Sequence, residues 1–220
     1  SIIHDYDALM IRSGTQVTGD IINSSKKLRI IGRAGVGVDN VDVKAATQKG
    51  VLVVNSPGGN TIAAAEHTIA MMLALSRNIP IANSSTFLGK WERKKFVGNE
   101  LFKKKLGVVG LGKIGTHVAK VANALGMDVY GYDPFVSSER AQQLQVRLSE
   151  LKTLFEESDY VTLHLPRTSE TENLVDMKVL KSMKKNAKLI NCARGGIIDE
   201  EALAEALNNS LIGGAAIDVF

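Results

Sequence analysis

The first 60 residues alternate between short apolar runs and segments whose apolar positions follow helical spacing. The runs predict strands over residues 8–11, 29–31 and 51–54, and the helical spacing predicts helices over 20–26 and 41–48. Short β-branched runs separated by helices are typical of βαβ units, whose strands are parallel. The pattern therefore predicts a small α/β domain built on a parallel sheet.

A cluster of turn-forming residues at 55–60, Asn-Ser-Pro-Gly-Gly-Asn, interrupts this alternation. Such a dense group of Pro, Gly and Asn indicates a boundary or a hinge. Apolar residues then recur at helical spacing over 62–76, which predicts a long helix after the hinge. We therefore expect one domain over residues 1–57 and a second over residues 58–220.

From residue 106 onward the apolar runs are stronger and continuous. Strands are predicted over 106–109, 129–132, 160–165, 189–192 and 215–219. Helices are predicted over 114–125, 148–157, 176–183 and 200–208. Strands that are apolar at nearly every position are buried on both faces, as in a doubly wound sheet. The predicted fold class is therefore α/β: a doubly wound parallel sheet of the Rossmann type, plus part of a smaller α/β domain.

A G-x-G-x-x-G sequence stands between the strand at 106–109 and the helix at 114–125. The first glycine, Gly110, suits a tight turn, Gly112 lets the backbone approach a pyrophosphate, and Gly115 lets helix and strand pack closely. Lys113 and Ile114 complete the turn and open the helix, whose N-terminus faces the phosphates. No Ser or Thr follows Lys113, so a Walker-type phosphate loop is absent. This context predicts a dinucleotide-binding site.

Asp133 closes the next predicted strand, 18 residues after Gly115. A carboxylate in that place can accept hydrogen bonds from the hydroxyls of the adenosine ribose. The same charge repels a 2′-phosphate, so the sequence favours NAD over NADP as the cofactor.

Composition and charge limit the possible partners. The chain has 220 residues, 45% of them hydrophobic and 23% charged, which excludes a disordered protein or a disulfide mini-scaffold. Its net charge is +4, but residues 90–105 alone carry +5, so a broad nucleic-acid-binding face is not expected. The single cysteine, Cys192, cannot form an intrachain disulfide and favours a reducing compartment, either the cytoplasm or an organelle stroma.

No apolar run reaches the roughly 18 residues of a membrane span. The best stretch, 62–75, is interrupted by Glu66 and His67, so we expect no membrane partner. The chain has no initiator Met and no signal peptide, and it stops after an apolar run. We expect it to be a fragment of a longer protein.

Four blocks of the sequence together resemble one enzyme family. They are residues 32–42, the glycine turn with Asp133, residues 164–168 and residues 191–199. They are similar to the D-isomer-specific 2-hydroxyacid dehydrogenases, whose motifs occur in this order. Residues 89–96 and Arg12-Ser13 look most like the branch that oxidises 3-phospho-D-glycerate to 3-phosphooxypyruvate, the first step of phosphorylated L-serine biosynthesis. The resemblance implies that residues 1–57 are part of a flavodoxin-like substrate domain and that 58–220 are an NAD-binding domain truncated at its C-terminal end.

The resemblance also assigns roles to individual residues. Arg194 matches the family's catalytic arginine, and its planar fork suits the substrate carboxylate. Residues implied in substrate binding are Arg12, Arg33, Gly35, Val36, Asn60 and Arg93. Of these, Arg12 and Arg33 could clamp a phosphate, and Arg93 could reach the site of a neighbouring subunit. Residues implied in lining the cofactor, besides the glycine turn and Asp133, are His164, Leu165, Pro166, Cys192, Arg194 and Asp218.

The resemblance implies that the general base, a His assisted by a Glu, follows the strand that ends at Phe220 and so lies beyond this sequence. None of the four histidines is a convincing substitute: His67 and His117 lie within helical patterns, and His164 matches a cofactor-lining block. No group of His, Cys and Asp has the spacing of a metal site, so no metal is expected.

Two other functions remain open from the sequence. One is a different dehydrogenase of the family, such as a glyoxylate or hydroxypyruvate reductase, and the other is a non-enzymatic NAD-sensing protein similar to a co-repressor. If the protein is a dehydrogenase, its expected partners are a small-molecule substrate and further copies of the chain, in a homodimer or homotetramer. Trp91, the sole tryptophan, then suits a dimer interface or packing.

Overall fold

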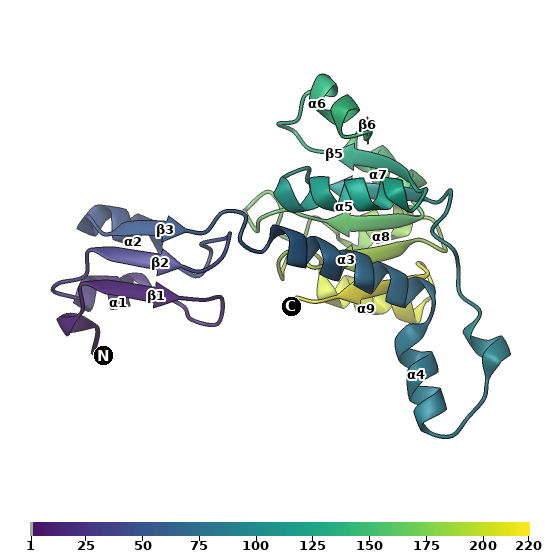
Figure 1. The fold of residues 1–220 in the computed structure, drawn as a ribbon, viewed down its shortest axis with the longest axis horizontal. Coiled ribbons are helices and arrows are strands. Elements are labelled where there is room, and N and C mark those ends of the chain that lie inside the picture. The colour runs from purple at the N-terminus through teal and green to yellow at the C-terminus, as the bar shows by residue number, and fades with distance from the viewer. Residues whose placement is uncertain (1) are drawn as a thin grey trace. The chain divides into compact units, whose positions relative to one another are not determined.

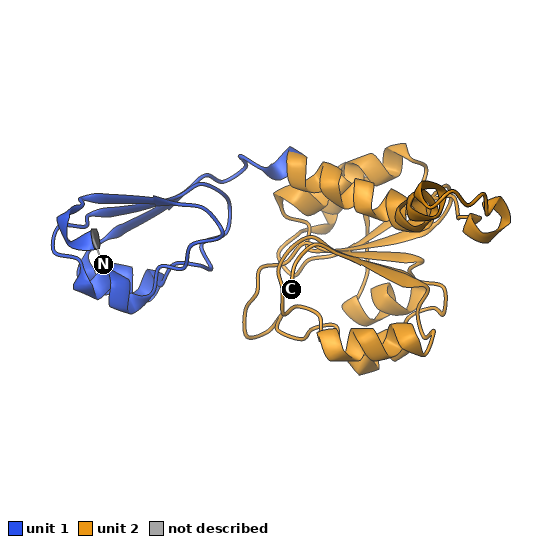
Figure 2. Cartoon of the chain, turned by 90° about the horizontal axis from the view of Figure 1, so that it is seen from below, with its two compact units in different colours: residues 1–62 blue, residues 63–220 orange. Residues whose placement is uncertain are grey.

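The computed structural model describes residues 2–220, and these divide into two compact units. The division falls between Ile62 and Ala63, just after the turn-forming cluster (Figure 2). We call residues up to 62 unit 1 and residues 63–220 unit 2, and each is described by itself. Within residues 2–220 no helix is both long enough and apolar enough to cross a membrane.

Within the described residues, unit 1 is a three-stranded parallel sheet in the order β1-β2-β3 with two α-helices and one short 3-10 helix, written η1. Its elements are η1 (Ile2–Asp5), β1 (Ala8–Ile11), α1 (Gly19–Ser24), β2 (Ile30–Arg33), α2 (Val43–Lys49) and β3 (Leu52–Asn55). The side chain of Asp42 caps α2 by accepting a hydrogen bond from the amide of Ala45 at 2.9 Å, and Gly50 ends that helix in the left-handed conformation. The βαβ units predicted for this region are thus present.

Unit 2 is a six-stranded sheet in the order β6-β5-β4-β7-β8-β9, with every pair of neighbours parallel. Its strands are β4 (Lys105–Val109), β5 (Asp128–Tyr132), β6 (Arg147–Leu148), β7 (Tyr160–Leu163), β8 (Lys188–Asn191) and β9 (Gly214–Ile217). Its helices are α3 (Thr61–Ser76), which begins two residues before the division, α4 (Ile79–Phe87), η2 (Arg93–Phe96), α5 (Lys113–Ala124), α6 (Ser138–Gln143), α7 (Leu151–Glu157), α8 (Met177–Ser182) and α9 (Glu200–Asn208). Numbered from β4, the strand order is 3-2-1-4-5-6, that of a doubly wound dinucleotide-binding fold. The predicted fold class is confirmed.

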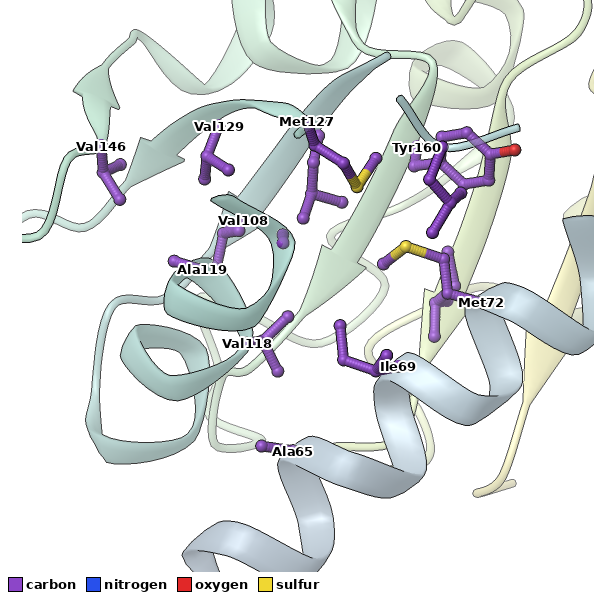
Figure 3. Close-up of a cluster of buried hydrophobic side chains, with 14 of the residues drawn as sticks. Ala65, Ile69, Met72, Val108, Val118, Ala119, Met127, Val129, Val146 and Tyr160 are labelled. Carbon is purple, nitrogen blue, oxygen red and sulfur yellow. The ribbon is translucent and has the colours of Figure 1, made fainter. Parts of the chain in front are cut away.

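The two faces of this sheet carry separate hydrophobic cores because side chains alternate along each strand. On β4, Leu106 and Val108 belong to the core beneath α3 and α5, whereas Val109 belongs to the core beneath α7, α8 and α9. Figure 3 shows Ile69 and Met72 of α3 in the first core with Tyr160. Helices cover both faces, as Figure 2 shows for unit 2. The sheet is therefore buried on both faces, and a ligand can bind only at the ends of its strands. We call these two sides of the sheet its amino edge and its carboxyl edge, after the ends of the strands that lie there.

Five elements were absent from the sequence prediction: the 3-10 helices η1 and η2, the helices α4 and α6, and the strand β6. Helix α4 lacks a buried apolar stripe, since Ile79, Ile81 and Phe87 are all more than half exposed. Helix α6 and strand β6 span only six and two residues, so neither gives a period that can be recognised.

Three predicted strands extend too far at their carboxyl ends. β7 ends at Leu163, β8 at Asn191 and β9 at Ile217, so the polar residues His164, Cys192 and Asp218 follow their strands instead of belonging to them. Apolar composition alone does not mark the residue at which a strand leaves the sheet. This difference places all three residues in loops at one edge of unit 2.

Candidate functional site

Five residues predicted to line a cofactor lie directly after five different strands of unit 2. They are Gly110 after β4, Asp133 after β5, His164 after β7, Cys192 after β8 and Asp218 after β9. The carboxyl ends of parallel strands meet at one edge, and β4 and β7, where the strand order reverses, are neighbours. Ligands of open α/β sheets bind at this carboxyl edge.

The glycine turn is held by two close backbone approaches. Gly110 has a φ of +95° and donates its amide to the carbonyl of Tyr132 at 2.8 Å. A Cβ on Gly115 would lie only 1.9 Å from the carbonyl oxygen of Gly110. Only glycine at position 115 therefore lets α5 begin so close to the end of β4.

Gly112 has a different environment, because a Cβ placed on it would meet no atom within 4 Å. It is the N-cap residue of α5, and no side chain caps that helix. The exposed amides at the start of a 12-residue helix carry partial positive charge and suit a phosphate. The space next to Gly112 is open to a ligand, whereas Gly110 and Gly115 are in close contact with neighbouring backbone.

Asp133 links the glycine turn to β5. Its Oδ2 accepts the amide of Leu111 at 2.8 Å, and its Oδ1 accepts the amide of Phe135 at 2.9 Å. A carboxylate has about four acceptor positions, so two remain for the hydroxyls of a ribose. Asp133 thus anchors the turn and still offers acceptors beside it.

His164 is neutral in the folded chain. Its amide donates to the carbonyl of Val109 at 2.8 Å, and its Nε2 lies 3.0 Å from the hydroxyl of Thr162. Burial lowers the pKa of His164 to about 4. It therefore takes up no proton at neutral pH and does not suit the role of a general base. Leu165 packs against the turn at Gly110, and Pro166 accepts the hydroxyl of Thr171 through its carbonyl at 2.6 Å.

Asn191 fixes the loop that carries Arg194. Its side chain is buried, accepts the amide of Ala193 at 3.0 Å and donates to the carbonyl of Arg194 at 2.9 Å. The guanidinium of Arg194 donates to the carbonyl of Ala193 at 2.7 Å. Sequence reasoning did not single out Asn191, although a polar residue at the end of an apolar strand is a recognisable signal.

His67, which its helical pattern predicts to be a structural or surface residue, reaches the same edge of unit 2. From α3, its Nε2 lies 3.2 Å from Oδ1 of Asp218. Their side chains are about half exposed. The thiol of Cys192 is nearby, and burial raises its pKa. No sequence signal brings these three residues together, because each comes from a separate element and they share no local motif.

In unit 1 the carboxyl edge of the sheet collects two predicted arginines. Arg12 follows β1, and Arg33 ends β2, where the register pairs it with Ile11 and Asn55. The Nε atom of Arg33 is buried and has no hydrogen-bond partner within residues 2–220. Buried Asn40, a residue the sequence analysis did not assign, holds the loop after β1 by donating to the carbonyl of Arg12 at 2.9 Å. An unsatisfied guanidinium donor suits an anionic ligand.

Gly35 and Val36, both implied in substrate binding, lie in the loop after β2. Gly35 donates its amide to the carbonyl of Arg33 at 2.9 Å, so that donor is already used. Val36 accepts the side-chain amide of Asn55 at 2.6 Å through its carbonyl. Its own amide has no protein partner in the described part of the chain, 2–220, and remains a donor for a ligand.

Asn60 and Arg93 lie outside these two groups. Asn60 is exposed in the turn before α3, and Arg93 is exposed in η2. The segment between α4 and β4, which includes η2, loops away from the sheet of unit 2 (Figure 1). Within unit 2, the structure does not bring Arg93 to the carboxyl edge of the sheet.

Comparisons with known proteins agree with this geometry. The profile of the family described as D-isomer specific 2-hydroxyacid dehydrogenase, NAD binding domain, matches residues 69–220. The chain is 61% identical over 219 residues to the D-3-phosphoglycerate dehydrogenase of Synechocystis sp., a match that covers 100% of this chain and 40% of that protein. It is 50% identical to the D-3-phosphoglycerate dehydrogenase of Bacillus subtilis, over 99% of this chain and 42% of that protein.

A solved structure is similar over almost the whole chain. The D-lactate dehydrogenase from Aquifex aeolicus, complexed with NAD and lactic acid, gives a TM-score of 0.91 at 30% sequence identity. The similarity covers 99% of this chain and 66% of that chain. Against the two curated relatives, by contrast, the chain spans only about 40% of their length.

Two alanine substitutions in the glycine turn should separate phosphate binding from packing. Gly112→Ala should change the free energy of unfolding by no more than about 1 kcal/mol, because a φ of −67° suits alanine whereas alanine is a poorer N-cap residue than glycine. It should nevertheless weaken NAD binding by about tenfold or more, because its methyl group fills the space of the pyrophosphate. Gly115→Ala should instead destabilise the fold by about 1–3 kcal/mol, because its Cβ overlaps the carbonyl of Gly110.

Urea unfolding and calorimetric titration with NAD measure the two effects separately. Unweakened NAD binding by Gly112→Ala would show that the open space at this glycine is not the phosphate site.

The neutral state of His164 predicts acid sensitivity. Its pKa of about 4 in the folded chain lies below the usual 6.5, so the unfolded chain takes up a proton first as the pH falls. Stability should therefore fall between about pH 6.5 and 4, by at most about 1.4 kcal/mol per pH unit from this residue. His164→Gln should remove that part of the slope in urea unfolding followed across this range. Equal slopes for both proteins would contradict a buried neutral imidazole.

Proposed function

The chain belongs to the D-isomer specific 2-hydroxyacid dehydrogenases, and from that premise we propose that the whole protein oxidises 3-phospho-D-glycerate to 3-phosphooxypyruvate with NAD. The observation that carries this proposal is the meeting of the glycine turn, Asp133 and the Arg194 loop at the carboxyl edge of unit 2. The names of the relatives at 50% and 61% identity support the choice of acid.

The cofactor lies along this edge in the proposal. The amides at the start of α5 and the open face of Gly112 hold the pyrophosphate, and Asp133 accepts the ribose hydroxyls. Lys113 and Ile114 form the first turn of that helix, and His164, Leu165 and Pro166 line the adjoining wall. Cys192 and Asp218 lie beside β8 and β9, toward the nicotinamide end. When bound, NAD supplies the ring that accepts a hydride.

Arg194 orients the substrate in this proposal. A guanidinium can hold a carboxylate through two parallel hydrogen bonds, which fixes the adjacent carbon relative to the cofactor. The support is the buried Asn191, whose two side-chain hydrogen bonds determine the path of the loop. Backbone rigidity of this kind positions an otherwise flexible side chain.

The residues of unit 1 that we assign to substrate binding suit an anionic ligand. Arg12 and Arg33 clamp the phosphate, and the free amide of Val36, next to Gly35, donates to the carboxylate. The buried, unpaired Nε of Arg33 supports this role because its donor is otherwise unsatisfied. In this scheme residues 1–57 belong to the substrate domain and 58–220 to the NAD-binding domain. Asn60 then lies in the segment that joins them.

Oxidation also requires a base that accepts the proton of the substrate hydroxyl. We place this base in the part of the relatives' sequences that this chain does not span. Among the histidines of unit 2, His164 has a pKa of about 4, too low for an effective base at neutral pH. His67 is engaged with Asp218. Arg194 is therefore the one catalytic residue that we assign within this sequence.

We propose that the whole protein forms a homodimer or homotetramer and is located in the cytoplasm. Large apolar side chains on α4 and the following segment support self-association, since Phe87 is 90% exposed and Trp91 is 83% exposed. Arg93 lies in the same segment and would then approach the site of a neighbouring subunit. The single cysteine suits a reducing compartment.

Asp133 should determine the choice of cofactor. In the full-length protein, Asp133→Ala removes acceptors for the ribose and a charge that repels a 2′-phosphate, each worth about 1–3 kcal/mol. The ratio of kcat/KM for NAD over NADP should fall by at least tenfold. Asp128→Ala, at the other end of β5, is the matched control and should leave the ratio unchanged. An unchanged ratio in Asp133→Ala would restrict this residue to anchoring the turn.

Arg12 should read the phosphate of the substrate. In the full-length protein, Arg12→Ala should lower kcat/KM for 3-phospho-D-glycerate by roughly 100-fold, as expected for a charged hydrogen bond of about 3 kcal/mol. Use of an unphosphorylated 2-hydroxy acid should barely change. Arg29→Ala, an exposed arginine just before β2, is the matched control. Equal losses on both substrates in Arg12→Ala would contradict the choice of phosphoglycerate.

A further inference from the structure

Three side chains at the carboxyl edge of unit 2 bring three different metal-binding atoms together. His67 comes from α3, Cys192 follows β8 and Asp218 follows β9. One ligand atom from each residue, a ring nitrogen, the thiol sulfur and a carboxylate oxygen, lies within 4.8 Å of the other two. Such a set, drawn from three separate elements, is more specific than a group of neighbouring acidic residues.

The donor atoms match the preferences of zinc. Zn²⁺ binds imidazole nitrogen and carboxylate oxygen at about 2.0–2.2 Å and thiolate sulfur at about 2.3 Å, in a tetrahedral arrangement. Donors at neighbouring corners of such a tetrahedron lie about 3.3–3.8 Å apart. The Nε2 of His67 and Oδ1 of Asp218 are already 3.2 Å apart. Small side-chain rotations would therefore suffice to complete the three-ligand set.

Backbone hydrogen bonds hold the loops that carry the cluster of His67, Cys192 and Asp218. Two of its three side chains are nevertheless accessible to solvent. The amide of Asp218 donates to the carbonyl of Asn191 at 3.0 Å, which holds the two loops together next to Cys192. The side chain of Thr68, which is buried, forms a hydrogen bond with the thiol of Cys192. The side chains of His67 and Asp218 are 48% and 46% exposed. An ion can thus enter from solvent and keep a water molecule as its fourth ligand.

A simple ion pair explains only part of this arrangement. An exposed His–Asp pair contributes little to stability and has no need of a thiol beside it. A soft sulfur donor together with imidazole selects zinc over magnesium or calcium, which prefer oxygen ligands alone.

We propose that His67, Cys192 and Asp218 form a binding site for a zinc ion. On binding, the sulfur–hydrogen bond of Cys192 breaks, the proton passes to solvent, and the thiolate forms a bond to Zn²⁺; no electrons are exchanged. Because Cys192 and Asp218 are also assigned to the nicotinamide end of the cofactor, zinc and NAD exclude each other. This second part rests on the proposed function, whereas the metal site itself does not.

The test uses Co²⁺ as a coloured substitute for zinc, added to the 220-residue chain without NAD. We expect a thiolate-to-cobalt charge-transfer band, tetrahedral visible bands and loss of both when Zn²⁺ is added. His67→Asn, Cys192→Ser and Asp218→Asn should each weaken Zn²⁺ affinity by about 100-fold or more, since changes to mere partners of ligands already cost 10–100-fold. His117→Asn, in α5, and Glu66→Gln, next to the site on α3, are matched controls and should bind as the unaltered chain does.

The unaltered chain tests first whether the metal binds the thiol, because Cys192 is the sole cysteine and a thiolate-to-cobalt band can come from no other residue. Absence of this band would overturn the zinc site, and so would unweakened Zn²⁺ affinity in His67→Asn and Asp218→Asn. A calorimetric titration with NAD at fixed Zn²⁺ then tests the overlap, for which we expect the apparent NAD affinity to fall as zinc rises. Metal binding without any effect on NAD affinity would leave the metal site standing and would contradict the placement of the cofactor over Cys192 and Asp218. Unchanged NAD binding in a chain that takes up no metal would leave the proposed function intact.

Discussion

The close approach of two glycines constrains the whole site of unit 2. The carbonyl of Gly110 occupies the space that a Cβ on Gly115 would need, and this contact determines where α5 begins after β4. With the helix start fixed, the amides before it face the carboxyl edge of the sheet, and the carboxylate of Asp133 can accept the amide of Leu111 within the turn. A bulkier residue at 115 would move the helix, the turn and the carboxylate together.

The remaining site residues follow from the parallel sheet. Strands that all run in one direction end at one edge, so side chains far apart in the sequence become neighbours without any local motif. Buried polar residues then fix the loops: Asn191 holds the path of the Arg194 loop in unit 2, and Asn40 holds the loop after Arg12 in unit 1. Both asparagines satisfy backbone groups that no strand partner reaches. The same edge therefore carries both the proposed dinucleotide site and, overlapping it, the three metal-binding atoms of the proposed zinc site.

Much of this fold was predictable because strong local signals agreed with it. Apolar runs located the strands β4, β5, β7, β8 and β9, and the glycine spacing located the turn together with Asp133. The prediction was wrong where the signal is weak, as for α4, whose apolar residues are exposed, and at the strand ends near His164 and Cys192. The contact between His67 and Asp218 could not be predicted from the sequence, because it depends on how α3 packs across the sheet and not on spacing along the chain.

Hydrogen–deuterium exchange of the 220-residue chain, with and without NAD, tests the placement of the cofactor most directly. If NAD binds at the carboxyl edge of unit 2, exchange should slow for three groups of amides. These are residues 110–116, the residues that directly follow Asp133, and the loop 191–196. The amino edge of the same sheet, including residues 184–188, should exchange at an unchanged rate. Protection confined to that amino edge, or to unit 1, would contradict the account.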